Sequence, residues 1–362
     1  MKRLIHTLIE QEYSVTVCAP LGLLAMNYRE EFYSDLQADT IHVLFNIPVA
    51  ANQQYVVNYA IGKYDAIIID EASMVTDDTF DMVHDTLKKQ VHRSLVIIAG
   101  DECQQSPLRT INGRTTQTTS ILKNRHLREV CQIHSLYQQF RCTDKAYLDF
   151  LQYIRYSQPQ PYVLDNFQRP LLLFQQSEIS DYDIWHTVKD APDATFLTVS
   201  RAPADRVNRI VMARMFEDRT PVSTIPLQND VHDFLPFRDM RVVVTQNLDK
   251  RTGVVNGQLA TIKNNQNNTL LLQFPNGKTT FTYPLTTSTE DGHSRVHYAL
   301  NPAYCMTICK TQGANIKKLI VWFDCRTVPT GMGYVALSRV RKSEDIKFMT
   351  PILAHQLTPA LT

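Results

Sequence analysis

Two adjacent carboxylates, Asp70 and Glu71, follow a short apolar run that ends at Ile69. The run is rich in β-branched residues and is not amphipathic, so it predicts a buried strand of a parallel sheet. Ligands of open α/β sheets bind beyond the carboxyl ends of such strands, where this pair would lie. One carboxylate there can hold Mg²⁺, and its neighbour can orient and deprotonate a water molecule. The alternative interpretation is a solvated turn without a chemical role.

A second polar segment, Gly100-Asp101-Glu102-Cys103-Gln104, directly follows another apolar run at 95–99. Glycine lets the backbone turn sharply at the end of a strand. The side-chain amide of Gln104 can contact a phosphate group or the water that attacks it. The alternative is a Gly-Asp turn without a chemical role. Because the segment follows the strand after Asp70 and Glu71, we favour a site that these residues share.

The elements that must position these residues alternate between strands and helices, which predicts a mostly parallel α/β fold with helices on both faces. We expect residues 104–125 to form an exposed polar loop and residues 240–285 to form a small antiparallel β module. Strands are predicted at 13–19, 64–70, 95–99, 196–199 and 319–323, and helices near 1–12, 21–37, 77–90, 143–155, 203–217 and 331–341.

Composition limits the remaining possibilities. The 362 residues suffice for two domains, and 37 Lys and Arg against 36 Asp and Glu give a net charge of +1, so nucleic-acid binding must come from a local surface. The seven cysteines form no CxxC pair, which favours free thiols in a reducing compartment. No signal peptide or membrane-spanning run is present, so we expect an intracellular, soluble protein, nuclear in a eukaryote and otherwise cytoplasmic.

Two segments near the C-terminus carry a family resemblance. They are 303–314, which contains Lys310-Thr311-Gln312-Gly313, and 333–341, which contains Ala336-Leu337-Ser338-Arg339. With Asp70-Glu71 and Gly100-Asp101 before them, the chain resembles superfamily-one DNA helicases of the PIF/RecD-like branch, which move 5′ to 3′ on single strands. The resemblance implies two RecA-like domains with ATP and Mg²⁺ between them, and roles in DNA repair or recombination.

The resemblance also implies a role for each matching residue. Catalytic roles fall to Glu71 as general base, Gln104 as γ-phosphate sensor, and Arg141 and Arg339 as phosphate-contacting arginines, since guanidinium is always charged and binds phosphate bidentately. Leu21 and Cys309 replace the usual Thr and His of the family. Nucleotide-binding residues would be Asp70 (also the Mg²⁺ ligand), Gly100, Asp101, Gln312 and Gly313, and DNA-binding residues Pro20, Gly22, Thr40, His42 and Thr311.

A phosphate-binding P-loop needs the pattern G-x-x-x-x-G-K-[ST]. The one Gly-Lys-Thr is Gly277-Lys278-Thr279, which has Leu272 where the first glycine belongs and follows Pro275-Asn276 between two alternating runs. This context predicts a hairpin turn. The opening helix instead resembles the one that follows the P-loop, so we expect the chain to begin after that loop and to lack one interior strand, which would lower its stability.

The sequence therefore predicts an ATP-dependent DNA helicase that translocates on single-stranded DNA, opens duplex junctions and acts as a monomer. We expect an incomplete first RecA-like domain at 1–137 with an insertion at about 43–62, and a second at 138–362 with an SH3-like insertion at about 253–300. The alternative is a helicase remnant that lacks the P-loop and binds nucleic acid without hydrolysing ATP. An oxidoreductase is disfavoured because the chain has no GxGxxG motif.

Overall fold

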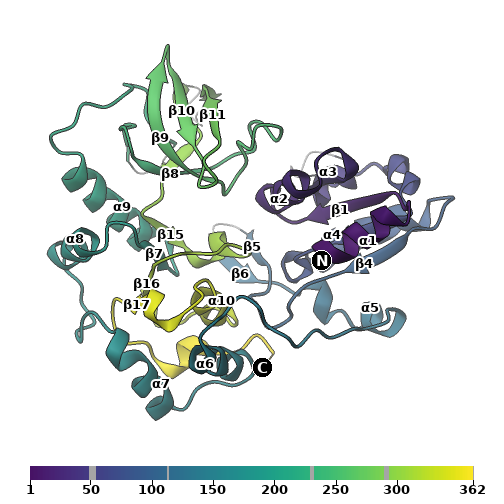
Figure 1. Ribbon diagram of the computed structural model, residues 1–362, viewed down its shortest axis with the longest axis horizontal. Coiled ribbons are helices and arrows are strands. Elements are labelled where there is room, and N and C mark those ends of the chain that lie inside the picture. The colour runs from purple at the N-terminus through teal and green to yellow at the C-terminus, as the bar shows by residue number, and fades with distance from the viewer. Residues whose placement is uncertain (49–53, 112–113, 229–231, 289–292, 362) are drawn as a thin grey trace. The chain divides into compact units, whose positions relative to one another are not determined.

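The computed structural model describes residues 1–48, 54–111, 114–228, 232–288 and 293–361 (Figure 1). The chain forms two compact units. Unit 1 comprises residues 1–139, 329–332 and 359–362, and unit 2 comprises residues 140–328 and 333–358. Residues 49–53 of the predicted insertion at 43–62 lie outside the described part.

Unit 1 is built on a four-stranded parallel sheet in the order β2-β1-β3-β4. Its central strands are buried along their whole length because helices cover both faces. Ile5 of α1 packs with Tyr28 and Phe32 of α2 on one face, and Val83 of α4 packs on the other face with Ile41 of α3. The elements are α1 (Lys2–Glu10), β1 (Val15–Ala19), α2 (Gly22–Phe32), β2 (Gln37–Thr40), α3 (Ile41–Leu44), β3 (Ala66–Ile69), α4 (Asp77–Lys88), β4 (Leu95–Ile98), β5 (Leu108–Ile111), β6 (Arg114–Gln117) and α5 (Arg125–Val130).

Strand β4 differs from its neighbours although its sequence is equally apolar. Among the described residues it pairs only with β3, so it is an edge strand. Leu95 is 56% exposed, and the three residues after it are half-buried. An apolar strand with one open side is unusual, because exposed edges offer unpaired main-chain groups to other strands.

Unit 2 contains a second parallel sheet, in the order β15-β7-β16-β17, joined to an antiparallel sheet in the order β11-β10-β9-β8-β14. One core connects them: Val207 of α9 and Phe196 of β7 belong to the same cluster as Ile262 and Leu270 of the antiparallel sheet. The elements are α6 (Lys145–Tyr156), α7 (Pro161–Gln168), α8 (Asp181–Asp190), β7 (Thr195–Thr198), α9 (Arg201–Met215), β8 (Arg241–Val244), β9 (Leu259–Gln266), β10 (Thr269–Gln273), β11 (Thr279–Thr282), β12 (Pro284–Ser288), β13 (Ser294–Tyr298), β14 (Leu300–Pro302), β15 (Cys305–Thr307), β16 (Leu319–Trp322), α10 (Met332–Leu337) and β17 (Ile346–Phe348).

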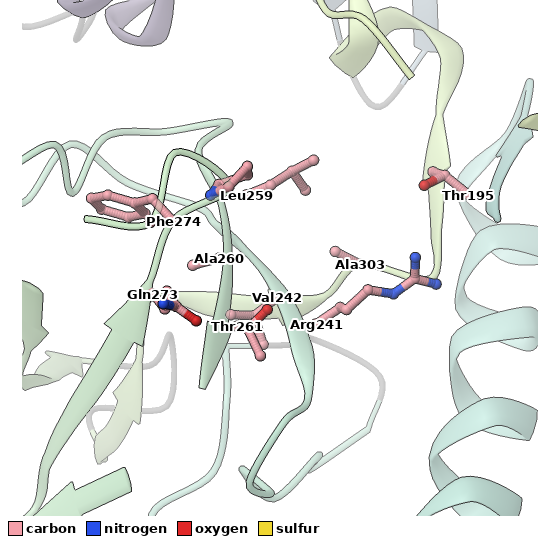
Figure 2. Close-up of a pocket in the computed structure, with 11 residues that line it drawn as sticks. Thr195, Arg241, Val242, Leu259, Ala260, Thr261, Gln273, Phe274 and Ala303 are labelled. Carbon is pink, nitrogen blue, oxygen red and sulfur yellow. The ribbon is translucent and has the colours of Figure 1, made fainter. Parts of the chain in front are cut away.

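Arg241 fastens the antiparallel sheet to the start of β7. Its guanidinium donates to the carbonyl oxygens of Asp193 (3.2 Å) and Ala194 (2.9 Å) and lies 4.5 Å from the centre of the Tyr304 ring. The same side chain lines a cavity of about 430 Å³ (Figure 2). Burial lowers the pKa of Arg241, which stays charged nonetheless because an arginine starts from so high a value.

These observations confirm the predicted α/β class with its antiparallel module. The prediction for 104–125 was wrong in part, because this segment contains the β5–β6 hairpin and the buried side chain of Gln105. Threonine-rich strands without an apolar face give no alternation signal in the sequence. No helix among the described residues has the length and apolar character needed to span a bilayer.

Candidate functional site

The carboxyl ends of the four parallel strands of unit 1 meet at one edge of the sheet. Ala19 pairs with Thr40, and Ile69 pairs with Ile98, so the segments that leave these strands start side by side. This edge brings together most of the predicted residues of the first domain. They are Pro20, Gly22, Thr40, His42, Asp70, Glu71, Gly100 and Asp101.

The carboxylate of Asp70 is held by Tyr28, a residue that the sequence did not indicate. The Tyr28 hydroxyl on α2 donates to Asp70 Oδ2, and the Asp70 main-chain N–H donates to the carbonyl of Cys18 (2.9 Å). Burial, and then the charge of Asp70, raise the pKa of Tyr28, so the phenol keeps its proton and remains a donor. Asp70 is thereby fixed at both its backbone and its side chain.

Glu71 adopts a left-handed backbone conformation, with φ of 51° and ψ of 42°. Such a conformation is costly for a residue with a side chain and is concentrated at functional sites. The next residue stabilises this turn, because the N–H of Ala72 donates to the carbonyl of Ala99 (2.9 Å), which directly follows β4. The turn leaves the Glu71 side chain half-exposed at the sheet edge.

Gly100 is required by close packing at the same edge. A Cβ at this position would lie 2.8 Å from Leu122 Cδ1 and 3.0 Å from the main-chain nitrogens of Ala72 and Ser73. Since backbone atoms cannot give way cheaply, only glycine fits. The segment after β4 is therefore pressed against the turn that carries Glu71.

Asp101 organises the turn that presents Gln104. Its carboxylate accepts from the N–H of Cys103 (3.0 Å) and from Gln104 Nε2 (3.3 Å). Gln104 Oε1 is buried and has no hydrogen-bond partner among the described residues. A buried acceptor without a partner is rare and is expected where a water or ligand binds. Asp101 thus stabilises the turn, and the side-chain oxygen of Gln104 remains able to accept a hydrogen bond.

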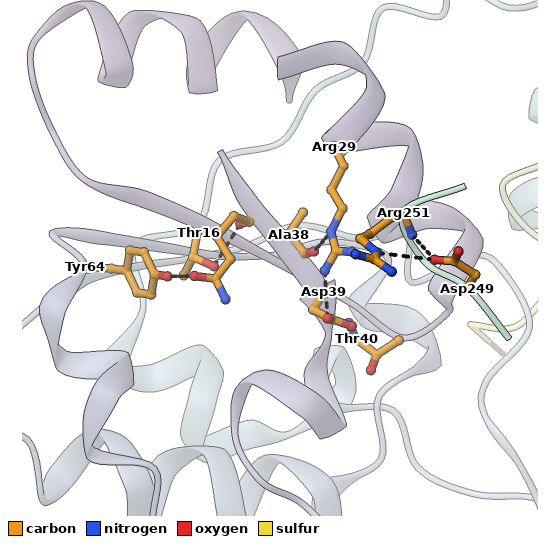
Figure 3. Close-up of polar contacts among 9 residues, drawn as sticks. Thr16, Arg29, Ala38, Asp39, Thr40, Tyr64, Asp249 and Arg251 are labelled. Carbon is orange, nitrogen blue, oxygen red and sulfur yellow. Dashed lines mark hydrogen bonds and ion pairs between the residues drawn. The ribbon is translucent and has the colours of Figure 1, made fainter. Parts of the chain in front are cut away.

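A charged network orients Thr40 at the end of β2 (Figure 3). Arg29 on α2 forms an ion pair with the buried Asp39 (2.7 Å) and donates to the carbonyl of Ala38. Asp39 Oδ1 in turn accepts from the N–H of Thr40 (2.7 Å), and Thr40 itself is half-exposed. Sequence reasoning missed both Arg29 and Asp39, because their pairing depends on how α2 returns along β2.

His42 is the second residue of α3, two positions after Thr40, and is half-buried. Burial lowers the pKa of its imidazole, so the ring is neutral near pH 7. Any contact of His42 with a nucleic acid is then made by a hydrogen bond or by ring stacking, without a full charge.

In unit 2, Arg339 is fully buried, with 1% of its surface exposed. Its Nε donates to the carbonyl of Val335 (2.7 Å), Nη1 donates to Thr311 (3.1 Å) and Ala314 (3.5 Å), and Nη2 donates to the hydroxyl of Ser338 (2.7 Å). The side chain therefore ties helix α10 to the 311–314 loop, and its guanidinium is not presented to solvent.

Arg141 lies against the same segment of unit 2 but is exposed. Its Nη1 donates to the carbonyl of Ser338 (3.3 Å), and the N–H of Thr143 donates to the carbonyl of Arg341 (3.1 Å). The two predicted phosphate-contacting arginines are thus brought together within one unit, Arg141 with a free approach from solvent and Arg339 without one.

The 311–314 loop contains three further predicted residues. Thr311 is buried, and its hydroxyl donates to the carbonyl of Ile308 (2.7 Å). Gln312 is 7% exposed, and Gly313 has a φ of 76°, a value that favours glycine. A side-chain contact between Thr311 and DNA remains a prediction and requires this loop to open.

Gly277-Lys278-Thr279 forms the turn of the β10–β11 hairpin, as the sequence predicted. The N–H of Phe274 donates to the carbonyl of Lys278 (2.8 Å), and Gly277 has a φ of 86°. No helix follows this turn, and phosphate-binding loops lead into helix N-termini. The segment is therefore not a nucleotide site.

The residues at the edge of unit 1 fit Mg²⁺ that is bound together with phosphate. The described residues hold no cluster of three or more His, Cys, Asp or Glu. Mg²⁺ in nucleotide sites is bound by one or two carboxylates, phosphate oxygens and water, not by a closed protein cage. Tyr28 uses only Asp70 Oδ2, and no described residue donates to Oδ1, so one oxygen of the carboxylate is left for a cation.

Comparison with known proteins supports the fold. The AAA domain family model matches residues 1–162. Bacteroides Pif1 bound to single-stranded DNA is similar over 98% of this chain and 86% of its own, with 22% identity and a TM-score of 0.69. Bacteroides Pif1 with ADP-AlF3 and single-stranded DNA is similar over 99% of this chain and 93% of its own, with 20% identity and a TM-score of 0.66.

Pif1 helicase from Candida albicans is similar as well, with 16% identity, coverage of 99% of this chain and 95% of its own, and a TM-score of 0.64. No curated protein sequence matches the chain. The similarity extends over both units and confirms, at the level of fold, the resemblance that the motifs indicated. The chain has the RecA-like fold of the Pif1 helicases.

Proposed function

We propose that this protein is an ATP-dependent DNA helicase that translocates on single-stranded DNA and unwinds duplex. The observation that carries the proposal is the edge of unit 1, where Tyr28 fixes Asp70 and Glu71 occupies a left-handed turn. A nucleotide hydrolase needs a cation ligand and a base at this place. Solved Pif1 structures of the same fold hold single-stranded DNA and ADP-AlF3.

Each polar residue of the edge has a defined task in this proposal. Asp70 Oδ1 would hold Mg²⁺, which when bound neutralises charge on phosphate oxygens. A carboxylate oxygen of Glu71 would take the proton from the attacking water. Gln104, held by Asp101, would offer its free Oε1 to the N–H or O–H groups that gather there.

Arg141 and Arg339 would contribute positive charge to the transferring phosphoryl group. Arg141 is accessible as it stands, whereas Arg339 would first have to leave the carbonyls of Thr311 and Ala314. That release would move Gln312 and Gly313, which the same loop carries. Pro20, Gly22, Thr40 and His42 would face the DNA strand in unit 1, and Thr311 in unit 2.

The test is the substitution Glu71→Gln in the full-length protein. The amide keeps the size of the side chain but cannot accept a proton, so we expect DNA-stimulated ATP hydrolysis to fall by about 10²–10⁴-fold. Binding of a fluorescent ATP analogue should remain within about twofold, because Glu71 is not proposed to hold the nucleotide.

Glu10→Gln is the matched control, because Glu10 is an exposed glutamate on α1 in the same unit. Its turnover should equal that of the wild type. Wild-type turnover in the Glu71→Gln variant would contradict the role of Glu71 as general base.

A second candidate is a nucleic-acid-binding protein that does not hydrolyse ATP. It is favoured by the burial of Arg339, whose guanidinium is already hydrogen-bonded to main-chain carbonyls. This candidate predicts tight binding of single-stranded DNA with no ATP turnover in wild type or variant. Measurable DNA-stimulated hydrolysis by the wild type rules it out.

A further inference from the structure

Strand β11 of unit 2 exposes two aromatic rings on one face. Along 279–283 the side chains alternate: Thr280 and Thr282 point into the core with 8% and 2% of their surface exposed, whereas Phe281 is 46% and Tyr283 is 64% exposed. The alternation continues past the end of the strand, so both rings lie on the outer face. A single exposed ring is common on protein surfaces, but these two rings share one face with half-buried Leu271 of β10, which pairs with Phe281, and such apolar patches mark binding surfaces.

Phe281 lies opposite Leu271 of β10, but neither ring has an aromatic, cationic or hydrogen-bonding partner among the described residues. Many other aromatic residues of unit 2 have such partners. Strand β11 is also the end strand of its sheet, as Figure 1 shows for β9, β10 and β11. The rings are therefore open to a ligand from the outer face and from the strand edge.

The spacing of the rings suits separate bases of one strand. Side chains two residues apart on a β-strand lie about 7 Å from each other. Aromatic side chains set in this way on a sheet stack with successive unpaired bases in single-strand-binding proteins. Both rings are large flat apolar surfaces, and the hydroxyl of Tyr283 adds a polar group beside the second one.

The charge of this sheet is compatible with a polyanion. The strands β9, β10 and β11 contain no Asp or Glu, and Lys263 lies on β9. Lys278 is exposed in the turn that leads into β11. A nucleic-acid strand that crosses the outer face meets threonine and amide side chains, the half-buried Leu271 and exposed Lys278, together with Lys263, which forms an ion pair with Asp239 (2.9 Å).

We infer that Phe281 and Tyr283 form a stacking surface for bases of single-stranded DNA on the antiparallel sheet of unit 2. The inference rests on the proposed function and extends it by a contact that lies outside the helicase motifs. The chemistry recognised is the unpaired base and not its sequence, since every base has a flat π face. Removing both rings is expected to weaken binding by about tenfold or more.

The experiment measures the affinity of the full-length protein for fluorescein-labelled oligo(dT) and for an abasic strand of equal length. The test variant is Phe281→Val with Tyr283→Val, because valine suits a strand but has no ring. Phe281→Trp with Tyr283→Phe keeps both rings and should bind as the wild type does. The control is Tyr162→Ala, which removes another exposed ring of unit 2, on α7, and should leave affinity unchanged.

The wild type should prefer oligo(dT) to the abasic strand, and the valine variant should lose most of that preference. If the wild type binds oligo(dT) and the valine variant binds it equally well, this inference fails while the proposed function stands. If the wild type binds no DNA, the proposed function fails and the inference with it. If the rings instead contact a second copy of the protein, sedimentation will show that the wild type is a dimer and the valine variant a monomer. The two proteins will then bind DNA with equal affinity, which also overturns the inference.

Discussion

Tyr28 is the residue on which the position of Asp70 depends. Its hydroxyl is the one donor to the Asp70 carboxylate among the described residues, and it comes from α2, far away in the sequence. A hydrogen bond to a charged acceptor contributes more than one between neutral groups. This pair therefore combines local stability with the orientation of a cation ligand.

We predict that Tyr28→Phe lowers the free energy of unfolding by about 1–3 kcal/mol, because a partly buried carboxylate loses its donor. Urea denaturation at pH 7 measures the change. Tyr13→Phe is the control, because Tyr13 is an exposed tyrosine of the same unit. Equal stability of the Tyr28→Phe variant and the wild type would show that the hydrogen bond does not contribute.

The same pair also gives a dependence on pH. The pKa of Tyr28 is raised in the folded state, first by burial and then by Asp70, so its stabilising effect is complete below the unfolded pKa of about 10. Above that pH the unfolded chain loses a proton that the folded chain retains, and stability falls. The stability difference between wild type and Tyr28→Phe should therefore narrow between pH 9 and pH 11, whereas a constant difference would contradict the assignment.

At the scale of elements, Arg339 joins helix α10 to the loop that follows β15. The bonds go to the carbonyl of Val335 in the last turn of α10 and to the carbonyls of Thr311 and Ala314 in the loop. A guanidinium is suited to this because its planar fork donates in several fixed directions at once. The role is structural in this conformation and separate from the phosphate contact that the sequence predicted.

We predict that Arg339→Lys lowers the free energy of unfolding by about 2–4 kcal/mol, because a single ammonium group cannot reach all of these acceptors. Arg341→Lys provides the control, since Arg341 is exposed two residues further on. Urea denaturation of both variants should show a loss for the first and a change below about 0.5 kcal/mol for the second. A wild-type unfolding midpoint in Arg339→Lys would contradict the structural role.

Elements that are signalled by neighbouring residues were predictable from the sequence, whereas contacts between distant elements were not. The apolar run that ends at Ile69 predicted β3, and the two acids after it predicted the edge of the sheet, because both signals are local. The Tyr28–Asp70 and Arg29–Asp39 pairs were not predictable, since each depends on how α2 packs against the sheet. The burial of Arg339 was missed for the same reason: the motif specifies an arginine but not the carbonyls that surround it.

At the scale of the whole molecule, the chain first passes from unit 1 to unit 2 through a segment without helix or strand, and it returns to unit 1 at 329–332 and 359–362. Residues 131–140 are almost all exposed, and they include Leu136 (92%), Tyr137 (82%) and Phe140 (79%). Exposed chain outside regular structure is where proteases cut first. Each unit has a core of its own, so neither depends on this segment for its packing.

We predict that chymotrypsin cleaves the native protein first within residues 136–140 and leaves two resistant fragments. Mass spectrometry of a limited digest identifies the cut. Replacing Leu136, Tyr137 and Phe140 by serine should slow this first cleavage, whereas Tyr162→Ser on α7 should not change it. Early cleavage inside β1 or β16 would contradict the division into two compact units.

The exposed edge of strand β4 affects how the protein associates with other chains. Among the described residues one side of β4 is unpaired and Leu95 is exposed, so another extended apolar chain, such as the same segment of a newly made molecule, can pair with it. Natural sheets often blunt such an edge with lysine or proline, and Leu95–Ile98 contains neither. Of the two edge strands of this sheet, β2 (Gln37–Thr40) contains polar residues and β4 contains none, so β4 is the edge expected to pair with another chain.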